Sequence, residues 1–191
     1  MKIFFDTEFT GLHKNTTLIS IGLVTENGKT FYAEFTDYDE SQCDDWIKEN
    51  VISHLSNKGA RGFVATSCVD GINTRVIGNK SYVKDQLEVW FSRFNNEKIE
   101  LVSDVCHYDM VLFIDIFGSA WDIPNNINPA CHDINQDIAR YYEIDEVEAF
   151  DYSREQILEN CDYHIEGDKH NALYDAKVIK FIYELIRSHG V

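Results

Sequence analysis

The sequence has few residues that could cross-link the chain. Among its 191 residues there are five cysteines, which stand apart from one another and form no C-x-x-C pair: Cys43, Cys68, Cys106, Cys131 and Cys161. An odd number of scattered cysteines argues against a disulfide framework and against a zinc site. We therefore expect reduced thiols and, with them, a cytoplasmic location.

Long hydrophobic runs are also missing. No apolar run approaches the roughly 20 residues that a bilayer-spanning helix needs. The N-terminal stretch MKIFFDTEF acquires acidic residues after three apolar ones, which does not fit a secretory signal. Hydrophobic residues still make up 44% and aromatic residues 13% of the chain, a globular composition. We expect no membrane partner and one domain spanning residues 1–191, a length that suffices for one core.

Basic residues are scarce. Lys and Arg number 17 against 33 Asp and Glu, which gives a net charge of −16 at pH 7. A chain with this charge is poorly suited to holding long nucleic acids on a general positive surface, because it would repel their phosphates. The excess of acid suits a protein that binds cations, or one that takes a small ligand.

What the sequence does contain is the apolar patterning of a mixed α/β domain. Continuous or alternating apolar runs predict strands at 2–9, 17–25, 29–35 and 98–105, and the Asn27-Gly28 pair is typical of a tight hairpin. Apolar spacings of three to four residues predict helices at 44–55, 81–94, 108–118 and 171–188. A three-strand meander followed by β-α-β units predicts a mixed sheet with helices on its faces.

Shorter elements and one ambiguous segment complete this pattern. Asp133 is predicted to cap a helix after a short strand, and Ser153 opens a capping-box pattern, SREQ. Residues 57–80 are rich in glycine and small residues, and predict either a loop or a protruding hairpin within the domain. The charged residues of this segment are mostly basic: Lys58, Arg61, Asp70, Arg75 and Lys80.

The stretch IFFDTE ends the first predicted strand in two acidic residues, Asp6 and Glu8. Side chains two apart in a strand lie on the same face, about 7 Å apart. Two carboxylates so placed repel each other unless a cation joins them or one is protonated. Mg²⁺ and Mn²⁺ prefer such oxygen ligands. The alternative is a solvated strand end with two ordinary charges.

Two later acidic residues stand in comparable positions. Asp109 begins an apolar helix, where the helix dipole alone would stabilise it. Asp175 lies beside the apolar stripe of the last helix, where an acid is costly unless it is paired or bound to metal. His170 precedes Asp175 by five residues, so the two can share a site only if His170 lies in the turn that enters the helix.

In this order along the chain, FFDTEFTGL, HYDMVLFIDIFG and DKHNALYDAK resemble the three motifs of DnaQ-like 3′–5′ exonucleases of the DEDDh type. With LISIGLVTENGKTFYAEF, they look most like the RNase AS group of bacterial exoribonucleases. The resemblance spans nearly the whole chain. It departs at SDVCHYD, where many members carry a His-Asn pair, and this leaves Asp104 and Asp109 as candidates for the second-motif acid. The register of MVLFIDIFG favours Asp109.

The resemblance implies an RNase H-like fold and hydrolysis with two divalent cations, Mg²⁺ or Mn²⁺, which would release nucleoside 5′-monophosphates from single-stranded or short RNA 3′ ends. It implies two catalytic residues, His170 and Glu8, of which His170 would act as the general base. It implies four metal ligands. It also implies that the stretch after the first motif contacts the substrate, although the aromatic residue of this stretch, Phe9, could instead belong to the core. The ligands are Asp6, Glu8, Asp109 and Asp175, and the contacting residues are Phe9, Thr10 and Leu12.

Other readings stay open. A DNA exonuclease of the same fold would carry the same motifs, because recognition of the 2′-hydroxyl depends on geometry. A catalytically silent nucleic-acid-binding or protein-binding module is the alternative from another class. The basic residues within 57–80 would either guide an RNA backbone or simply lie on a hairpin. The resemblance also implies a homodimer.

Overall fold

In the computed structural model, residues 1–56, 64–69, 73–94 and 96–190 are described. Among them, seven strands form one mixed sheet in the order β4-β5-β3-β2-β1-β6-β7. Neighbouring strands are antiparallel in the pairs β4/β5, β3/β2 and β2/β1. They are parallel in the pairs β5/β3, β1/β6 and β6/β7. The strands are β1 (Lys2–Phe9), β2 (Leu18–Thr25), β3 (Thr30–Phe35), β4 (Ala65–Val69), β5 (Asn73–Gly78), β6 (Glu100–Ser103) and β7 (His132–Asp133).

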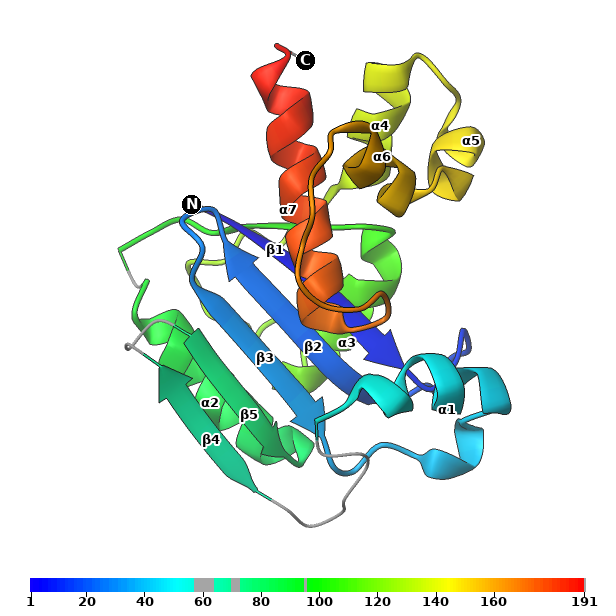
Figure 1. Cartoon of the computed structure of the whole chain (residues 1–191). Coiled ribbons are helices and arrows are strands. Elements are labelled where there is room, and N and C mark those ends of the chain that lie inside the picture. Colours follow the sequence, from blue (N-terminus) through cyan, green and yellow to red (C-terminus); the bar gives the residue numbers. More distant parts are fainter. Residues whose placement is uncertain (57–63, 70–72, 95, 191) are drawn as a thin grey trace.

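Helices cover both faces of the sheet (Figure 1). The long C-terminal helix α7 crosses one face over β1 and β2, whereas α2 and α3 lie on the other face. The helices α4, α5 and α6 form a group beside α7. The helical bounds are α1 (Asp45–Asn50), α2 (Lys80–Ser92), α3 (Cys106–Phe117), α4 (Ile134–Tyr142), α5 (Glu146–Asp151), α6 (Arg154–Asn160) and α7 (Ala172–Ser188), with short 3₁₀ turns η1 (Glu40–Gln42) and η2 (Ile52–His54).

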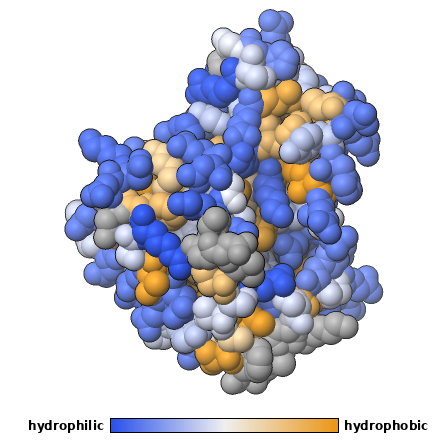
Figure 2. All heavy atoms as spheres, turned by 60° about the vertical axis from the view of Figure 1, so that its left-hand side comes forward, coloured by the Kyte–Doolittle hydropathy of each residue, from blue (hydrophilic) through white to orange (hydrophobic). Residues whose placement is uncertain are grey.

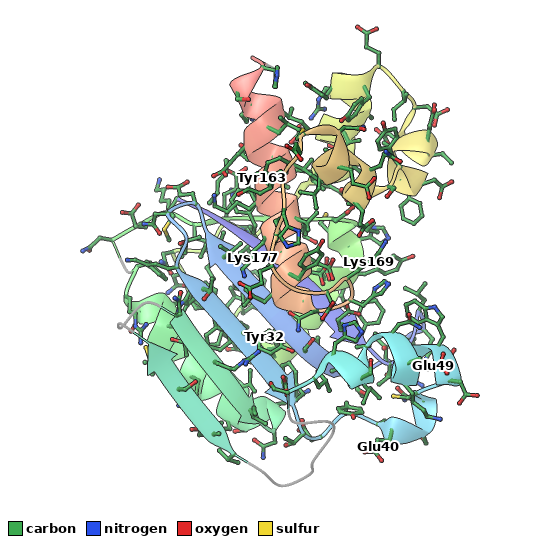
Figure 3. The ribbon with its side chains drawn as sticks, in the orientation of Figure 1. Tyr32, Glu40, Glu49, Tyr163, Lys169 and Lys177 are labelled. Carbon is green, nitrogen blue, oxygen red and sulfur yellow. The ribbon has the colours of Figure 1, made fainter. Side chains whose placement is uncertain are left out.

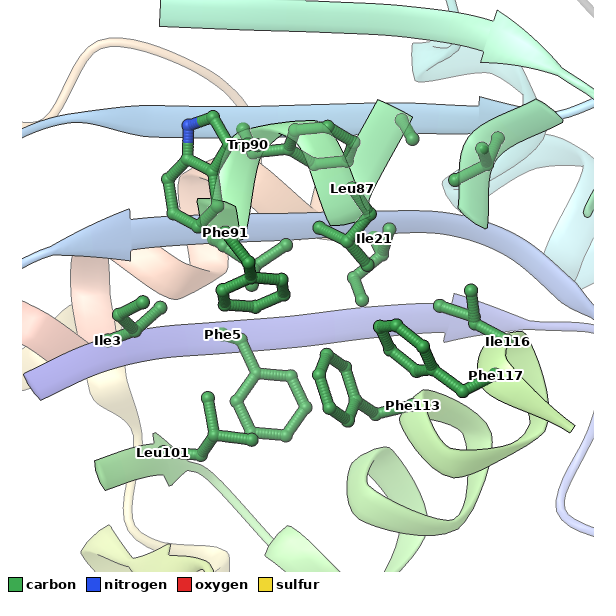
Figure 4. Packing of buried hydrophobic residues seen from close by; sticks show 14 of the residues in the cluster. Ile3, Phe5, Ile21, Leu87, Trp90, Phe91, Leu101, Phe113, Ile116 and Phe117 are labelled. Atoms are coloured by element: carbon green, nitrogen blue, oxygen red, sulfur yellow. The ribbon is translucent and has the colours of Figure 1, made fainter. Parts of the chain in front are cut away.

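The side-chain alternation of β1 divides the core into two layers. Ile3 and Phe5 belong to the cluster under α2 and α3, while Phe4 belongs to the cluster under α4, α6 and α7. In Figure 4, Phe5 lies beside Phe113 of α3, and their ring centroids are 5.7 Å apart. Burying each such aromatic side chain contributes roughly 1.5–3 kcal/mol. The same alternation puts Asp6 and Glu8 on the α7 side of the sheet.

The expected fold is confirmed, with differences in detail. The first three strands lie where the pattern predicts them, and the parallel strands follow. The predicted helix at 44–55 is divided into α1 and η2. The helix predicted at 81–94 begins one residue earlier as α2, and the side chain of Asn79, directly after β5, caps it. The helix α5 occupies a strongly acidic stretch for which the apolar spacing predicts no helix.

The strands β4 and β5 lie within the segment 57–80. They pair antiparallel with each other, and β5 pairs in parallel with β3, so that these two strands extend the sheet. Parallel pairing between strands separated by about 40 residues leaves no local signal in the sequence. Residues 57–63 and 70–72 lie outside the described part of the chain, and with them Lys58, Arg61 and Asp70.

The surface is largely hydrophilic. In the view of Figure 2, hydrophilic residues cover most of the face, and hydrophobic residues form small separate areas. None of the helices in the described ranges is both long enough and apolar enough to cross a membrane.

Candidate active site

Three carboxylates from the two ends of the chain meet beside the end of β1. Asp6 and Glu8 project from the same face of this strand, and Asp175 comes from the first turn of α7. One oxygen atom from each carboxylate lies within 4.8 Å of the other two. The cluster thus joins two of the three sequence motifs.

Gly22 lets α7 approach the sheet at this point. It pairs with Asp6 across the β1/β2 ladder, and a Cβ atom added to it would lie 2.3 Å from the carbonyl oxygen of Ala172. The helix therefore begins directly on the sheet, one turn before Asp175. Asn171 caps it by accepting hydrogen bonds from the backbone N–H groups of Leu173 and Tyr174 at 3.2 and 3.3 Å.

A second contact ties the start of α7 to β3. The side-chain amide of Asn171 donates to the hydroxyl of Tyr32 at 3.3 Å, and Figure 3 shows Tyr32 on the sheet below the first turn of α7. Preceding this cap, His170 adopts a left-handed backbone conformation with φ 64°. That conformation is uncommon for a residue with a side chain, and it is concentrated at functional sites.

His170 lies in the entering turn, as the spacing to Asp175 requires. Its Nδ1 atom is 4.0 Å from Oε1 of Glu8. Partial burial, aided by the charge of Lys169, lowers the pKa of the imidazole below its usual value. The ring is therefore neutral at pH 7, in the state that can accept a proton.

Asp109 borders the same cavity but is not in the three-carboxylate cluster. It is 3% exposed. One of its oxygens accepts hydrogen bonds from the backbone N–H and hydroxyl of Thr7, at 3.1 and 2.5 Å, and the other accepts a short one from the hydroxyl of Ser103. The structure thus brings Asp109 to the wall of the site and fixes its orientation through β1 and β6.

Asp104, the other candidate for the second-motif acid, has a basic partner. Arg154 of α6 donates two hydrogen bonds to its carboxylate, at 2.7 and 2.9 Å, and Asn135 donates a third at 2.8 Å. Arg154 also donates to the carbonyl of Ala149 at 2.7 Å. This network joins β6 to the α4–α6 group and neutralises Asp104. The sequence pattern did not single out Arg154 or Asn135, because nothing local marks their contact with a residue some 30 to 50 positions away.

Burial and mutual repulsion raise the pKa values of the acidic residues in the site. Desolvation, followed by the charges of the neighbouring carboxylates, raises the pKa of Asp6 and of Glu8 well above their usual values. Burial raises the pKa of Asp109 and of Asp175 to about 7. In the described part of the chain, no Lys or Arg lies within ion-pair distance of Asp6, Glu8 or Asp175. Among the described residues the cluster thus has no Lys or Arg partner, and its carboxylate oxygens are suitable ligands for a hard divalent cation.

The acids line a cavity of about 410 Å³. Its other wall comes from the helical group and the loop before α7, and includes Phe150, Tyr152, Glu155 and Lys169. Lys169 is paired with Glu155 across this wall at 3.1 Å. This wall of the cavity therefore carries aromatic and charged side chains beside the acidic residues.

A second cavity of about 570 Å³ adjoins the first. Phe9 and Tyr108 line both cavities, and their ring centroids are 6.4 Å apart. Leu12, which is 72% exposed, lines only the second cavity. Thr10 lines neither: it is buried, and its hydroxyl accepts from the backbone of Thr17 at 2.9 Å and donates to Gln42. The predicted substrate-contacting residues Phe9 and Leu12 thus border a cavity, whereas the side chain of Thr10 fixes the loop.

The sheet order, the helix across β1 and β2, and the acids at the end of β1 define an RNase H-like nuclease of the DnaQ-like DEDDh class. Solved structures share the fold. The nuclease domain of 3′hExo, described as a DEDDh family member bound to rAMP, covers 99% of this chain and 92% of its own at 15% identity and TM-score 0.63. Pop2p from S. pombe, in a Mg²⁺- and Mn²⁺-bound form, covers 99% and 83% at 14% identity and TM-score 0.63.

Sequence comparison gives the family. Residues 1–186 match the 3′-5′ exoribonuclease Rv2179c-like domain, and the chain belongs to this family. The 3′-5′ exoribonuclease Rv2179c of Mycobacterium tuberculosis is 24% identical over 136 residues, which are 71% of this chain and 73% of that protein. The protein is a 3′–5′ exonuclease, and the resemblance of its three motifs to DEDDh enzymes is confirmed.

Proposed function

We propose that the protein removes nucleoside 5′-monophosphates from the 3′ ends of single-stranded or short RNA with the help of two divalent cations, Mg²⁺ or Mn²⁺. Asp6, Glu8, Asp109 and Asp175 would hold the ions. The observation that carries this proposal is the cluster of three carboxylates within 4.8 Å of one another, with the imidazole of His170 beside it. The exoribonuclease family and the relative from M. tuberculosis support RNA as the substrate.

Divalent cations bound in such a site lower the pKa of a water molecule and stabilise the charge that develops on a phosphate. The protein's own groups do the rest. His170 takes the proton from the attacking water, because its lowered pKa leaves it neutral. Glu8 lies 4.0 Å from His170 and stabilises the imidazolium that forms. Thr7 and Ser103 orient Asp109 through hydrogen bonds, as outer partners of ligating carboxylates do.

The adjoining cavity gives the substrate a path. The terminal phosphodiester would sit over the acids, and the bases would stack against Phe9 and Tyr108, which stand between the two cavities. Lys14 in the second cavity would face a phosphate of the preceding nucleotides, whereas Lys80 is paired there with Asp115 at 3.0 Å. The net charge of −16 disfavours long duplexes, so short or single-stranded ends suit the site.

Matched RNA and DNA oligonucleotides labelled at the 5′ end test this proposal. With Mn²⁺ or Mg²⁺ we expect RNA to shorten from its 3′ end with release of 5′-monophosphates, and EDTA to stop the reaction. Preferential shortening of DNA would favour the DNA exonuclease. If no mononucleotide is released while Asp6→Asn leaves RNA affinity unchanged, the silent binding module is favoured.

We also propose that the protein is a cytoplasmic homodimer. The five cysteines are all free thiols, which fits a reducing compartment. A stable dimer would bury about 1,200 Å² or more in total. Light scattering coupled to gel filtration measures its mass, and a monomer at micromolar concentration would contradict the homodimer.

A further inference from the structure

Trp46 lies in contact with His170 without belonging to the core or to the acidic cavity. Its side chain comes from the first turn of α1 and is 53% exposed. The indole meets the imidazole of His170 at 5.0 Å between ring centroids and at 74°, an edge-on arrangement. Such pairs attract because the positive edge of one ring faces the negative face of the other.

The helix that carries Trp46 is firmly anchored. Ile47, the next residue, is buried in a cluster with Ile19, Val51 and Leu55. Asp44 caps the helix by accepting from the backbone of Ile47 at 2.8 Å. Because its neighbour fixes the backbone, Trp46 is presented at a set position even though its own side chain is half in solvent.

The loop before α7 needs such a support. His170 is in the left-handed region, and its side chain is 30% exposed. On one side of the loop, Lys169 pairs with Glu155 of α6 at 3.1 Å. On the other side, Nδ1 of His54 in η2 lies 4.0 Å from Asp168. On this side, the ring of Trp46 contacts the imidazole itself.

We propose that Trp46 is a positioning residue for His170. The indole blocks rotation of the imidazole into solvent and keeps its Nδ1 atom toward Glu8. Trp46 does not border the acidic cavity, so it acts through His170 and not on the substrate. This inference rests on the proposed role of His170 as the general base.

The test is a double-mutant cycle on RNA hydrolysis with Mn²⁺. We expect Trp46→Ala to lower kcat by about tenfold or more, since displacement of a catalytic group by about 1 Å can cost 100-fold, with KM changed less than about twofold. Trp46→Phe keeps an aromatic ring at this position and should retain most of kcat. In a His170→Ala background, Trp46→Ala should have no further effect.

Two controls separate the possible failures. Trp121→Ala removes a tryptophan that is 93% exposed and should leave kcat and KM unchanged. NMR of the His170 ring protons should show a ring-current shift that Trp46→Ala abolishes and Trp121→Ala preserves. That readout needs no activity, so an inactive wild type with this shift overturns the proposed function and leaves the contact standing.

Three results would overturn the positioning role. The first is a rise in KM with unchanged kcat for Trp46→Ala, which would make Trp46 a substrate contact. The second is an undiminished effect of Trp46→Ala in the His170→Ala background. The third is a wild-type spectrum in which the His170 shift does not depend on Trp46.

Discussion

Gly22 lies against the carbonyl of Ala172, and this contact sets the distance between Asp6 and Asp175. The two acids come from β1 and α7. Gly22 of β2 pairs with Asp6 across the β1/β2 ladder and also meets the start of α7 at Ala172. Any larger residue at this position would have to lift the helix from the sheet, because the atom it meets is backbone.

Gly22→Ala should therefore impair both stability and activity. Overpacking of this kind costs about 1–3 kcal/mol in unfolding free energy, and the displaced Asp175 should lower kcat by at least about tenfold. Thermal denaturation and the oligonucleotide assay measure the two effects. Gly28→Ala is the matched control: its Cβ meets no atom within 4 Å, so only the backbone at φ 83° is strained, and activity per folded molecule should be unchanged.

Removal of divalent cations should make stability depend on pH. The pKa of Asp109 and of Asp175 is about 7 in the folded protein, against about 3.9 in an unfolded chain. Between these values the folded state holds more protons than the unfolded state, so the free energy of unfolding falls as pH rises from about 4 to about 7. Asp137 and Glu155 have lowered pKa values and act oppositely at lower pH.

In EDTA we thus expect a lower Tm at pH 7.5 than at pH 5.5, and Mn²⁺ or Mg²⁺ should restore the Tm at pH 7.5. Asp6→Asn removes one of the repelling charges, so in EDTA at pH 7.5 it should raise the Tm while abolishing activity. A Tm in EDTA that increases from pH 5.5 to 7.5 would contradict the assignment of the cluster as a cation site.

The choice between Asp104 and Asp109 is open to a direct comparison. Asp109→Asn should lower kcat by more than about 100-fold, because loss of a ligand forfeits several kcal/mol of charge stabilisation. Asp104→Asn should keep kcat within about threefold of wild type, since Asp104 is engaged by Arg154 and Asn135 and acts in structure. Equal losses in the two variants would remove the distinction.

Arg154→Ala checks the structural role from the other partner. The side chains of Arg154 and Asp104 are 13% and 21% exposed, so removal of the cation leaves a mostly buried carboxylate unpaired. We expect a loss of about 2–4 kcal/mol in unfolding free energy. Arg140→Ala, which removes a 57% exposed arginine from Asp137, should cost about 1 kcal/mol or less.

The sequence was most informative where chemistry is local. Asp6 and Glu8 share a face because they are two apart in a strand, and His170 reaches the site because it precedes the helix cap. The partners of Asp104 and the contact of Trp46 with His170 join residues far apart in the chain, and their residue types are also common on surfaces. The place of β5 beside β3 is likewise set by long-range pairing. These contacts and this strand pairing are evident only in the three-dimensional structure.

Lys14 tests whether the second cavity receives upstream nucleotides. Reversing its charge with Lys14→Glu should raise KM for a single-stranded RNA oligonucleotide by roughly threefold to tenfold, because one phosphate contact becomes repulsive. The effect should shrink in high salt, where charges are screened. For a nucleoside 5′-(p-nitrophenyl phosphate), which has no upstream nucleotide, KM and kcat should stay unchanged. Lys98→Glu makes the same charge change at the opposite end of the sheet, beside the N-terminus, and should affect neither substrate. If Lys14→Glu weakens both substrates equally, its charge acts on the terminal phosphate, and the upstream chain takes another path.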